Sequence, residues 1–314
     1  MLTRVLVTGG AGFIGTHIVD LLLENGVRVS VLDDLSTGAL ANLDPRVNLY
    51  MGRIQDRELV QEAVGRERPD YVIHQAAQAD VQVSLRDPGA DAGVNILGAI
   101  NLLEACRAGG VRKVVYASSA AVYGNPRYLP VDEQHPVAPV SGYGISKYTA
   151  ERYLMLYSFL HGLEFTALRY ANVYGPRQDA SGEGGVVAIF CSRLSGGAQP
   201  VIYGDGKQTR DFIYVRDVAA ANLAALQRGS GQILNISTGI PTSVNELLSA
   251  LGKVAGSGLQ AEYRAERPGD IGHSYLSPLR AIEALNWKPL VPLEEGLKIT
   301  YAYFSRQSSV VSRR

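Results

Sequence analysis

Features that would tie a protein to a metal, an oxidising compartment or a polyanion are scarce in this sequence of 314 residues. The two cysteines, Cys106 and Cys191, lie in apolar contexts, so we expect buried reduced thiols and no disulfide. The five histidines show no metal-ligand spacing, which predicts no metal site. The 30 basic and 30 acidic residues give a formal net charge of zero, which argues against a nucleic-acid-binding surface.

Long apolar runs are missing as well. No stretch of about 18 apolar residues occurs, so no transmembrane helix is expected. The opening segment MLTRVLVTGG has an apolar run too short for a secretory signal, and a cytoplasmic location is expected. The polar segment 305–314, rich in serine and arginine, is predicted to be a disordered tail.

Short β-branched and aliphatic runs alternate with helical patterns over residues 1–172. This alternation is typical of βαβ units, so it predicts an α/β fold with a Rossmann-type, doubly wound parallel sheet. Strands are predicted at 4–8, 27–33, 71–75, 113–118 and 164–170, and helices at 15–24, 59–64, 95–108 and 143–161.

The texture changes at about residue 173, where glycine and proline become frequent and the predicted elements become short. Helices are predicted at 215–226, 244–254 and 279–284. We expect a smaller lobe over residues 173–304 that contributes substrate contacts at the carboxyl edge of the sheet. The boundary is approximate, because a chain of this kind can cross back to the sheet.

A glycine-rich turn follows the first predicted strand in VLVTGGAGFIG, residues 5–15. Gly10, Gly12 and Gly15 have the spacing of the dinucleotide fingerprint, in which backbone and helix N-terminus approach a pyrophosphate. Asp33 ends the next strand, 18 residues after Gly15, where a carboxylate can bind both ribose hydroxyls and repel a 2′-phosphate. The pattern predicts an NAD-binding domain over residues 1–172; the alternative is a tight turn without a cofactor.

Tyr143 and Lys147 lie four residues apart in SGYGISKYTAERYL, a spacing that places both on one face of a helix. A phenol with a pKa of about 10 is a poor base at neutral pH, but an ammonium beside it favours the phenolate. The pair is therefore a candidate proton acceptor for a sugar or alcohol hydroxyl. The alternative is two solvated side chains, because this spacing is common.

Together these residues resemble the extended short-chain dehydrogenase/reductase family, over nearly the whole folded chain. Gly9, Gly12 and Gly15 fall on its G-x-x-G-x-x-G motif, and Tyr143 and Lys147 on its Y-x-x-x-K. The segments 33–35, 95–98 and 118–124 match further motifs of the family. The cofactor contacts that the resemblance implies are Gly9, Gly12, Phe13, Ile14, Gly15, Asp33, Asp34, Ile54, Ala76, Ala77, Asn95, Ser118, Tyr143, Lys147 and Tyr170.

Within the family, the second lobe is most similar to that of enzymes that bind a UDP-sugar. Arg210 and Arg267 fall where family members place guanidinium groups on the pyrophosphate, for which their fork geometry is suited. Asp270 resembles the residue that holds the uridine ribose, and Tyr203 falls in the uracil pocket. The implied substrate contacts are Ser84, Ser119, Asn172, Val187, Tyr203, Arg210, Arg267 and Asp270.

The resemblance also implies a reaction. Tyr143 removes the proton of the sugar 4-hydroxyl while NAD accepts hydride from C4, and Ser119 hydrogen-bonds the same hydroxyl. Dehydratases and decarboxylases of the family carry carboxylates where this chain has Ala120 and Ala121, so an isomerase that epimerises a UDP-hexose at C4 is favoured.

The sugar is left open. A small residue, Ser274, stands near the position that restricts the sugar pocket, so UDP-N-acetylglucosamine is an alternative to UDP-glucose, as is UDP-glucuronate. More distant alternatives are a dehydrogenase that releases NADH and a non-catalytic NAD-binding protein. The helices at 95–108 and 143–161 are those through which family members form homodimers, which implies a homodimer here.

Overall fold

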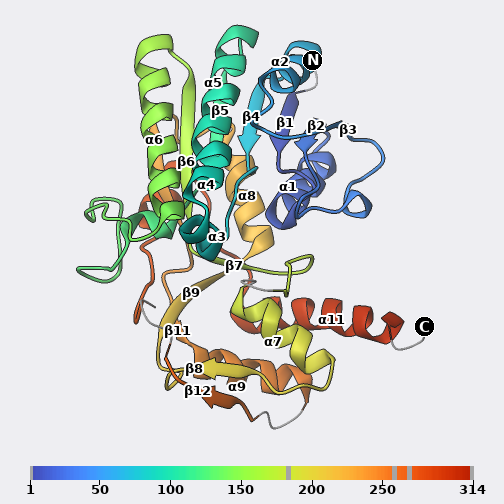
Figure 1. Cartoon of the computed structure of the whole chain (residues 1–314), viewed down its shortest axis with the longest axis vertical. Helices are drawn as coiled ribbons and strands as arrows, with labels where there is room; N and C mark the ends of the chain where they lie inside the picture. Colours follow the sequence, from blue (N-terminus) through green and yellow to red (C-terminus); the bar gives the residue numbers. More distant parts are fainter. Residues whose placement is uncertain (1–2, 182–184, 257–259, 267–270, 312–314) are drawn as a thin grey trace.

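The structure, a computed structural model of the chain, describes residues 3–181, 185–256, 260–266 and 271–311. A parallel sheet with the strand order β10-β6-β5-β4-β1-β2-β3 forms its centre (Figure 1). This confirms the predicted α/β fold with a parallel sheet. The strands are β1 (Arg4–Thr8), β2 (Arg28–Asp33), β3 (Asn48–Met51), β4 (Tyr71–His74), β5 (Lys113–Ser119), β6 (Glu164–Tyr170) and β10 (Gln232–Ile236).

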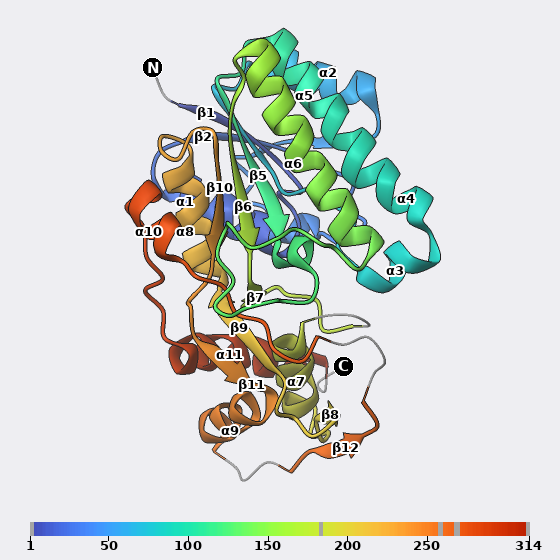
Figure 2. The same cartoon turned by 90° about the vertical axis from the view of Figure 1, so that its left-hand side faces the viewer.

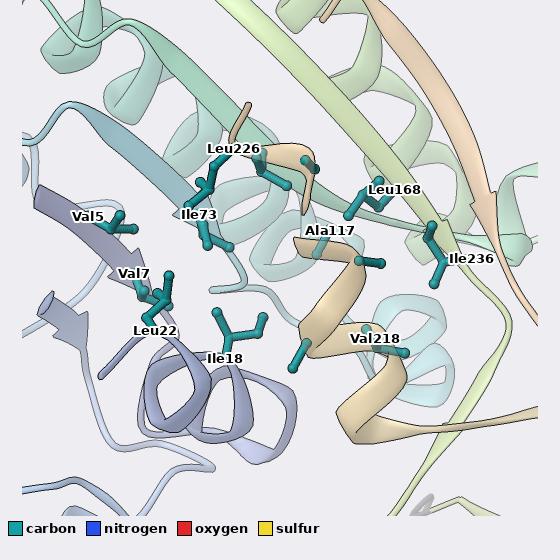
Figure 3. Close-up of a cluster of buried hydrophobic side chains, with 14 of the residues drawn as sticks. Val5, Val7, Ile18, Leu22, Ile73, Ala117, Leu168, Val218, Leu226 and Ile236 are labelled. Carbon is teal, nitrogen blue, oxygen red and sulfur yellow. The ribbon is translucent and has the colours of Figure 1, made fainter. Parts of the chain in front are cut away.

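Helices cover both faces of this sheet (Figure 2). One face carries α1 (Phe13–Glu24), α8 (Val215–Ala225) and α10 (Leu279–Leu285), and the other carries α2 (Arg57–Glu67), α5 (Gly98–Gly109) and α6 (Gly142–His161). On the first face, Val7 and Ile73 of the sheet pack with Ile18 and Val218 of the helices (Figure 3). A second buried cluster joins the sheet to α2, α5 and α6.

The strand order reverses between β1 and β4, which are neighbours in the sheet. In open α/β sheets, ligands bind outside the carboxyl ends of the strands at such a switch point. Two short helices that the sequence did not predict, α3 (Val81–Arg86) and α4 (Pro88–Ala92), follow β4. Asp80 and Asp87 cap them by accepting backbone N–H bonds at 3.0 and 2.9 Å. A π-helical turn, Gly93–Leu97, joins α4 to α5.

The smaller lobe lies beyond the carboxyl edge of the sheet (Figures 1 and 2). Strand β9 (Thr209–Tyr214) pairs in parallel with β7 (Asn172–Tyr174) and antiparallel with β11 (Pro241–Ser243). A separate parallel pair consists of β8 (Val201–Tyr203) and β12 (Glu262–Arg264). The helices of the lobe, which pack around a third buried cluster, are α7 (Val186–Ser195), α9 (Val244–Ala255) and α11 (Leu293–Val311).

The chain crosses back to the large sheet after its first passage through the lobe. Helix α8 packs beside α1, and β10 pairs with β6, so residues 215–236 join the sheet layers although they follow residue 172. The domain boundary near 172 stays a prediction. The predicted disordered tail is corrected in part, because α11 continues to Val311 and the hydroxyls of Ser308 and Ser195 are 2.9 Å apart. Polar composition could not show that this segment continues a packed helix.

In the ranges that the structure describes, no helix combines the length and the apolar composition that crossing a membrane requires. No group of three or more potential metal ligands was found among the same residues. Both cysteines are free and buried, as expected.

Candidate active site

The turn between β1 and α1 is tightly packed on one side and open on the other. A methyl group at Gly9 would come within 2.5 Å of the Ala76 backbone nitrogen, and one at Gly15 would collide with the Gly9 carbonyl. Gly9 also has φ +68°, a conformation that glycine adopts without strain. At Gly12, by contrast, a methyl group would meet only the Gly9 oxygen, at 3.4 Å. The protein's own packing requires Gly9 and Gly15, whereas the space at Gly12 is free for a ligand.

The N-terminus of α1 faces this open side. Gly12 is its N-cap residue, and the described helix has neither a side-chain cap nor an acidic residue in its first turn. The first N–H groups of a helix have no partner within it, and the helix dipole adds positive potential there. Phe13 and Ile14 open the helix and pack against the core of the smaller lobe. This end of α1 therefore suits a diphosphate.

Asp33 fixes the same turn from the end of β2. Its buried carboxylate accepts backbone N–H bonds from Ala11 and Leu35, both at 2.8 Å. Burial raises the pKa of Asp33, and these N–H bonds lower it. Because each carboxylate oxygen has a second lone pair, Asp33 can hold the turn and still accept a ribose hydroxyl. Asp34 beside it is exposed and accepts the Ser36 N–H at 3.0 Å.

Ser119, Tyr143 and Lys147 come together where the end of β5 meets the beginning of α6. Ser141 caps α6 by accepting the Gly144 N–H at 3.1 Å, which fixes where this helix begins. A side-chain hydrogen bond joins Ser119 to Tyr143. The Lys147 ammonium lies 5.8 Å from the centre of the Tyr143 ring. The three predicted catalytic residues therefore form one cluster.

The electrostatics of this cluster differ from the expectation that Lys147 lowers the pKa of Tyr143. Burial raises the pKa of Tyr143; the Ser119 hydrogen bond opposes the rise, and the Asp91 charge adds to it. Burial also lowers the pKa of Lys147 to about 8. The ammonium donates to the Ala117 carbonyl at 2.9 Å. Tyr143 therefore rests as a neutral phenol held by Ser119.

A buried cluster beside Lys147 was not predicted from the sequence. The Asp91 carboxylate, 1% exposed, accepts from the side-chain amides of Gln78 and Asn95 at 3.0 and 3.1 Å. Asn95, in the π-helical turn, also donates to the Gln78 carbonyl and the Ser146 hydroxyl. The Asp91 charge raises the pKa of Lys147 against the effect of burial. The sequence did contain one indication of this cluster: Asp91 precedes Asn95 by four residues, a spacing that places both side chains on one face of a helix.

The remaining predicted cofactor contacts differ in burial. Ala76 and Ala77 follow β4 and are partly exposed at the carboxyl edge. Ile54 is buried after β3. Ser118 and Tyr170 are buried at the ends of β5 and β6, and their hydroxyls are bonded to other side chains. Ala76 and Ala77 are thus the accessible members of this group, and all five roles stay predictions.

Two predicted substrate contacts share one face of the small sheet. Asn172 opens β7, is exposed, and is in register with Phe212 of β9. Arg210 lies two residues before Phe212, so its side chain is on the same face as that of Asn172. The Arg210 guanidinium donates to the carbonyls of Thr209 and Gly272 at 2.9 and 3.4 Å. This places Arg210 beside the segment that follows residue 270.

The other predicted substrate contacts are scattered. Ser84 is buried against Gly142, next to Tyr143, and its hydroxyl donates to the Val81 carbonyl at 2.7 Å. Tyr203 is partly buried in β8. Val187 is buried, and its side chain packs inside the core of the smaller lobe. Arg267 and Asp270 lie outside the described residues.

Comparison with known proteins connects this site to a family. Residues 5–237 match the model of the NAD dependent epimerase/dehydratase family. The chain belongs to this family. The resemblance drawn from the sequence is thereby confirmed, and the chain is an NAD-dependent enzyme of the epimerase type.

Three solved structures resemble this family member closely. UDP-glucose 4-epimerase from Thermotoga maritima with UDP-glucose is 46% identical, with 97% of this chain and 99% of that one covered and a TM-score of 0.95. UDP-glucose 4-epimerase from Thermus thermophilus with NAD is 45% identical, with coverage of 96% and 99% and a TM-score of 0.91. UDP-N-acetylglucosamine 4-epimerase from Methanobrevibacter ruminantium with UDP-N-acetylmuramic acid is 36% identical, with coverage of 98% and 100% and a TM-score of 0.93.

Sequence reasoning also missed a charged pair beneath the epimerase site. Glu151 of α6 and Arg169 of β6 form a buried ion pair at 2.6 Å. Glu151 follows Lys147 by four residues and Tyr143 by eight, so all three lie on one face of α6. That spacing was visible in the sequence, but nothing there indicated a partner for the carboxylate.

Proposed function

We propose that this family member interconverts UDP-glucose and UDP-galactose by epimerisation at C4. The observation that carries the proposal is the pairing of Ser119 with Tyr143 beside Lys147, whose ammonium lies 5.8 Å from the centre of the Tyr143 ring, with Ala120 and Ala121 in the next turn. The pair can move the proton of a sugar hydroxyl. The two alanine methyl groups cannot supply the further acid or base that dehydration needs. Oxidation at C4 followed by its reversal is the reaction that these groups support.

In this reaction Tyr143 is the base and Ser119 orients the 4-hydroxyl. The pKa of Tyr143 is raised by burial, so it must fall before the phenol oxygen can take the proton. A positive charge nearby has this effect. Lys147 contributes one, and NAD, when bound, would supply a positively charged nicotinamide ring that can accept hydride from C4 and return it. Ser119 hydrogen-bonds Tyr143 and can pass the proton between phenol and sugar in both directions.

The chain's own groups fit NAD in a definite orientation. The uncapped N-terminus of α1 and the open space at Gly12 would take the diphosphate. Asp33 would accept the hydroxyls of the adenosine ribose, and its charge disfavours the 2′-phosphate of NADP. Ala76 and Ala77, at the end of β4, would lie along the cofactor between these groups and the Tyr143 cluster.

The smaller lobe would hold the UDP part of the substrate. Asn172 and Arg210 share one face of the small sheet, and an amide with a guanidinium there suits a diphosphate. We assign Arg267 and Asp270 to the same nucleotide as predictions from the sequence. A second candidate substrate is UDP-N-acetylglucosamine, favoured by the small side chain of Ser274, whose backbone N–H donates to the Thr209 carbonyl at 3.1 Å.

The test is incubation with UDP-glucose, UDP-N-acetylglucosamine and UDP-glucuronate separately, with products identified by proton NMR. We expect conversion of UDP-glucose to UDP-galactose without accumulation of free NADH. Steady accumulation of NADH would instead identify a dehydrogenase. If none of the three sugars changes, the proposal fails and the substrate class is wrong.

We also propose that two copies of the chain pair through α5 and α6. Ile145, Leu156 and Phe159 of α6 are exposed, Phe159 by 86%, and Leu97 is exposed where α5 begins. A second copy seated on these residues would remove their apolar side chains from water, which is the main driving force of such association. The cytoplasmic location expected from the sequence is likewise part of the proposal.

A further inference from the structure

Three consecutive residues at the end of β5 are each tied to a different turn of α6. The Ala117 carbonyl accepts from Lys147 Nζ at 2.9 Å, and Ser119 hydrogen-bonds Tyr143. Between them, the Ser118 hydroxyl donates to Glu151 Oε1 at 2.6 Å. The first two ties involve the catalytic cluster, whereas the third lies one turn deeper along α6.

The third tie is built on a fully buried carboxylate. Glu151 is 0% exposed, and its two oxygens also accept from Arg169 Nε and Nη2 at 2.8 and 2.6 Å. The Arg169 guanidinium lies 4.7 Å above the centre of the Tyr123 ring. The Tyr123 hydroxyl in turn donates to Asn235 Oδ1 of β10 at 2.7 Å. One network therefore joins α6 to β5, β6 and β10 directly beneath the site.

Stability alone is a weak reason for such a network. Moving two charges out of water costs about as much as their attraction returns, and apolar pairs of similar volume often serve as well or better. The best-attested use of buried polar groups is to fix one packing register among several. A helix that slides by one residue moves about 1.5 Å along its axis and turns by about 100°. Either change would part Tyr143 from Ser119.

We propose that the Glu151–Arg169 pair is a positioning device that sets the register of α6 against β5, and so holds Tyr143 on Ser119. The inference rests on the proposed function of Ser119 and Tyr143 as the groups that act on the sugar hydroxyl. Neither Glu151 nor Arg169 touches the reacting atoms in this role. A displacement of about 1 Å in such a cluster can lower the rate by about 10²-fold.

The double variant Glu151→Leu with Arg169→Met tests the proposal, because it keeps the volume of the pair and removes its directional bonds. We expect an equal or higher melting temperature, unchanged NAD content and unchanged KM, but a kcat lower by about 10²-fold. A stable double variant with normal kcat overturns the inference. If the double variant does not fold, Ser118→Ala, which removes the 2.6 Å bond to Glu151, decides in the same way, with kcat measured at saturating NAD so that weaker cofactor binding does not count.

A matched control is Glu67→Leu. This buried carboxylate of α2 accepts from Asn48 Nδ2 and the Tyr50 hydroxyl at 2.7 and 2.9 Å, and Tyr50 lies in β3 at the far edge of the sheet. We expect the Glu67→Leu substitution to lower the melting temperature and leave kcat unchanged. A kcat loss equal to that of the double variant would show that Glu151 acts only through stability.

A crystal structure of the double variant shows the register of α6 against β5 independently of any activity measurement. We expect α6 to shift against β5 and the hydrogen bond between Ser119 and Tyr143 to be lost. If that bond is retained, the inference fails even when the unchanged chain is an active epimerase. Conversely, an unchanged chain that converts no UDP-sugar refutes the proposed function, and the shift of α6 is still decided by the crystal structure.

Discussion

A single methyl group at Gly12 should separate cofactor binding from folding. Gly12 has φ −75° and ψ 177°, a conformation that alanine adopts freely, and the added Cβ would meet only the Gly9 oxygen at 3.4 Å. Alanine restricts the unfolded chain, which stabilises by about 0.4–1 kcal/mol, but it is a poorer N-cap residue, which costs a similar amount. We expect the free energy of unfolding without NAD to change by less than about 1 kcal/mol.

The affinity for NAD should respond much more strongly. The methyl group would stand in the open space assigned to the diphosphate. Relieving one methyl overlap in a packed site costs about 1–3 kcal/mol, which corresponds to a Kd raised about 5- to 150-fold. Isothermal titration of NAD into the cofactor-free protein measures this change. A folded Gly12→Ala protein with an unchanged Kd would refute the assignment of the diphosphate to this turn.

Two other glycines provide matched controls for the same chemical change. At Gly15 the methyl group would collide with the Gly9 carbonyl, so the backbone must move and we expect a loss of about 3 kcal/mol or more. At Gly65 in α2, nothing lies within 4 Å, and alanine should stabilise by about 0.5–1 kcal/mol with an unchanged Kd for NAD. If Gly12→Ala proves as unstable as Gly15→Ala, the space at Gly12 is not free.

Three further predictions follow from the site and its surroundings. Tyr143→Phe should lower kcat by about 10²–10⁴-fold with the fold retained, as measured by initial rates and circular dichroism; near-normal activity would exclude Tyr143 as the base. His74 is buried with its pKa lowered to about 3, so the unfolded chain binds the extra proton between that value and about 6.5, and acid destabilises the fold. His74→Gln cannot bind this proton. The free energy of unfolding that it lacks relative to the unchanged protein, measured in urea, should therefore shrink by up to about 1.4 kcal/mol per pH unit as the pH falls through that window; a constant difference would contradict the reasoning. Phe159→Glu should convert the proposed dimer to monomers in analytical ultracentrifugation, whereas Phe159→Leu should not; an unchanged mass would place the interface elsewhere.

The sheet could be predicted because each of these strands is marked by a short stretch of its own sequence. The strands Arg4–Thr8 and Glu164–Tyr170 have the bounds read from the sequence, since a buried parallel strand is an apolar run bounded by turn residues. Glycine spacing likewise located the turn before α1, and the Tyr143–Lys147 spacing located the beginning of α6. In each case the signal lies within about a dozen residues.

What escaped prediction depends on contacts distant in sequence. Glu151 and Arg169 lie on different elements, and only the packing of α6 on β6 makes them a pair. In the sequence, Asp91 resembles any acidic residue of a helix; only the fold brings the amides of Gln78 and Asn95 into hydrogen bonds with it. The rise in the pKa of Tyr143 was missed for the same reason, because the spacing of Tyr143 and Lys147 in the sequence carries no information about the burial that causes it.

The return of β10 to the large sheet limits how this chain can be divided. A fragment that ends at residue 172 would leave the row Thr166–Tyr170 of β6 without its partners in Gln232–Ile236. An open, apolar edge of that kind recruits strands from other molecules and leads to aggregation. A chimera that exchanges the smaller lobe should therefore exchange two segments, one before and one after residues 215–236, and keep those residues and α10 with the parent sheet. The nucleotide-binding half is a closed unit only when it includes a strand encoded between the two parts of the lobe it carries.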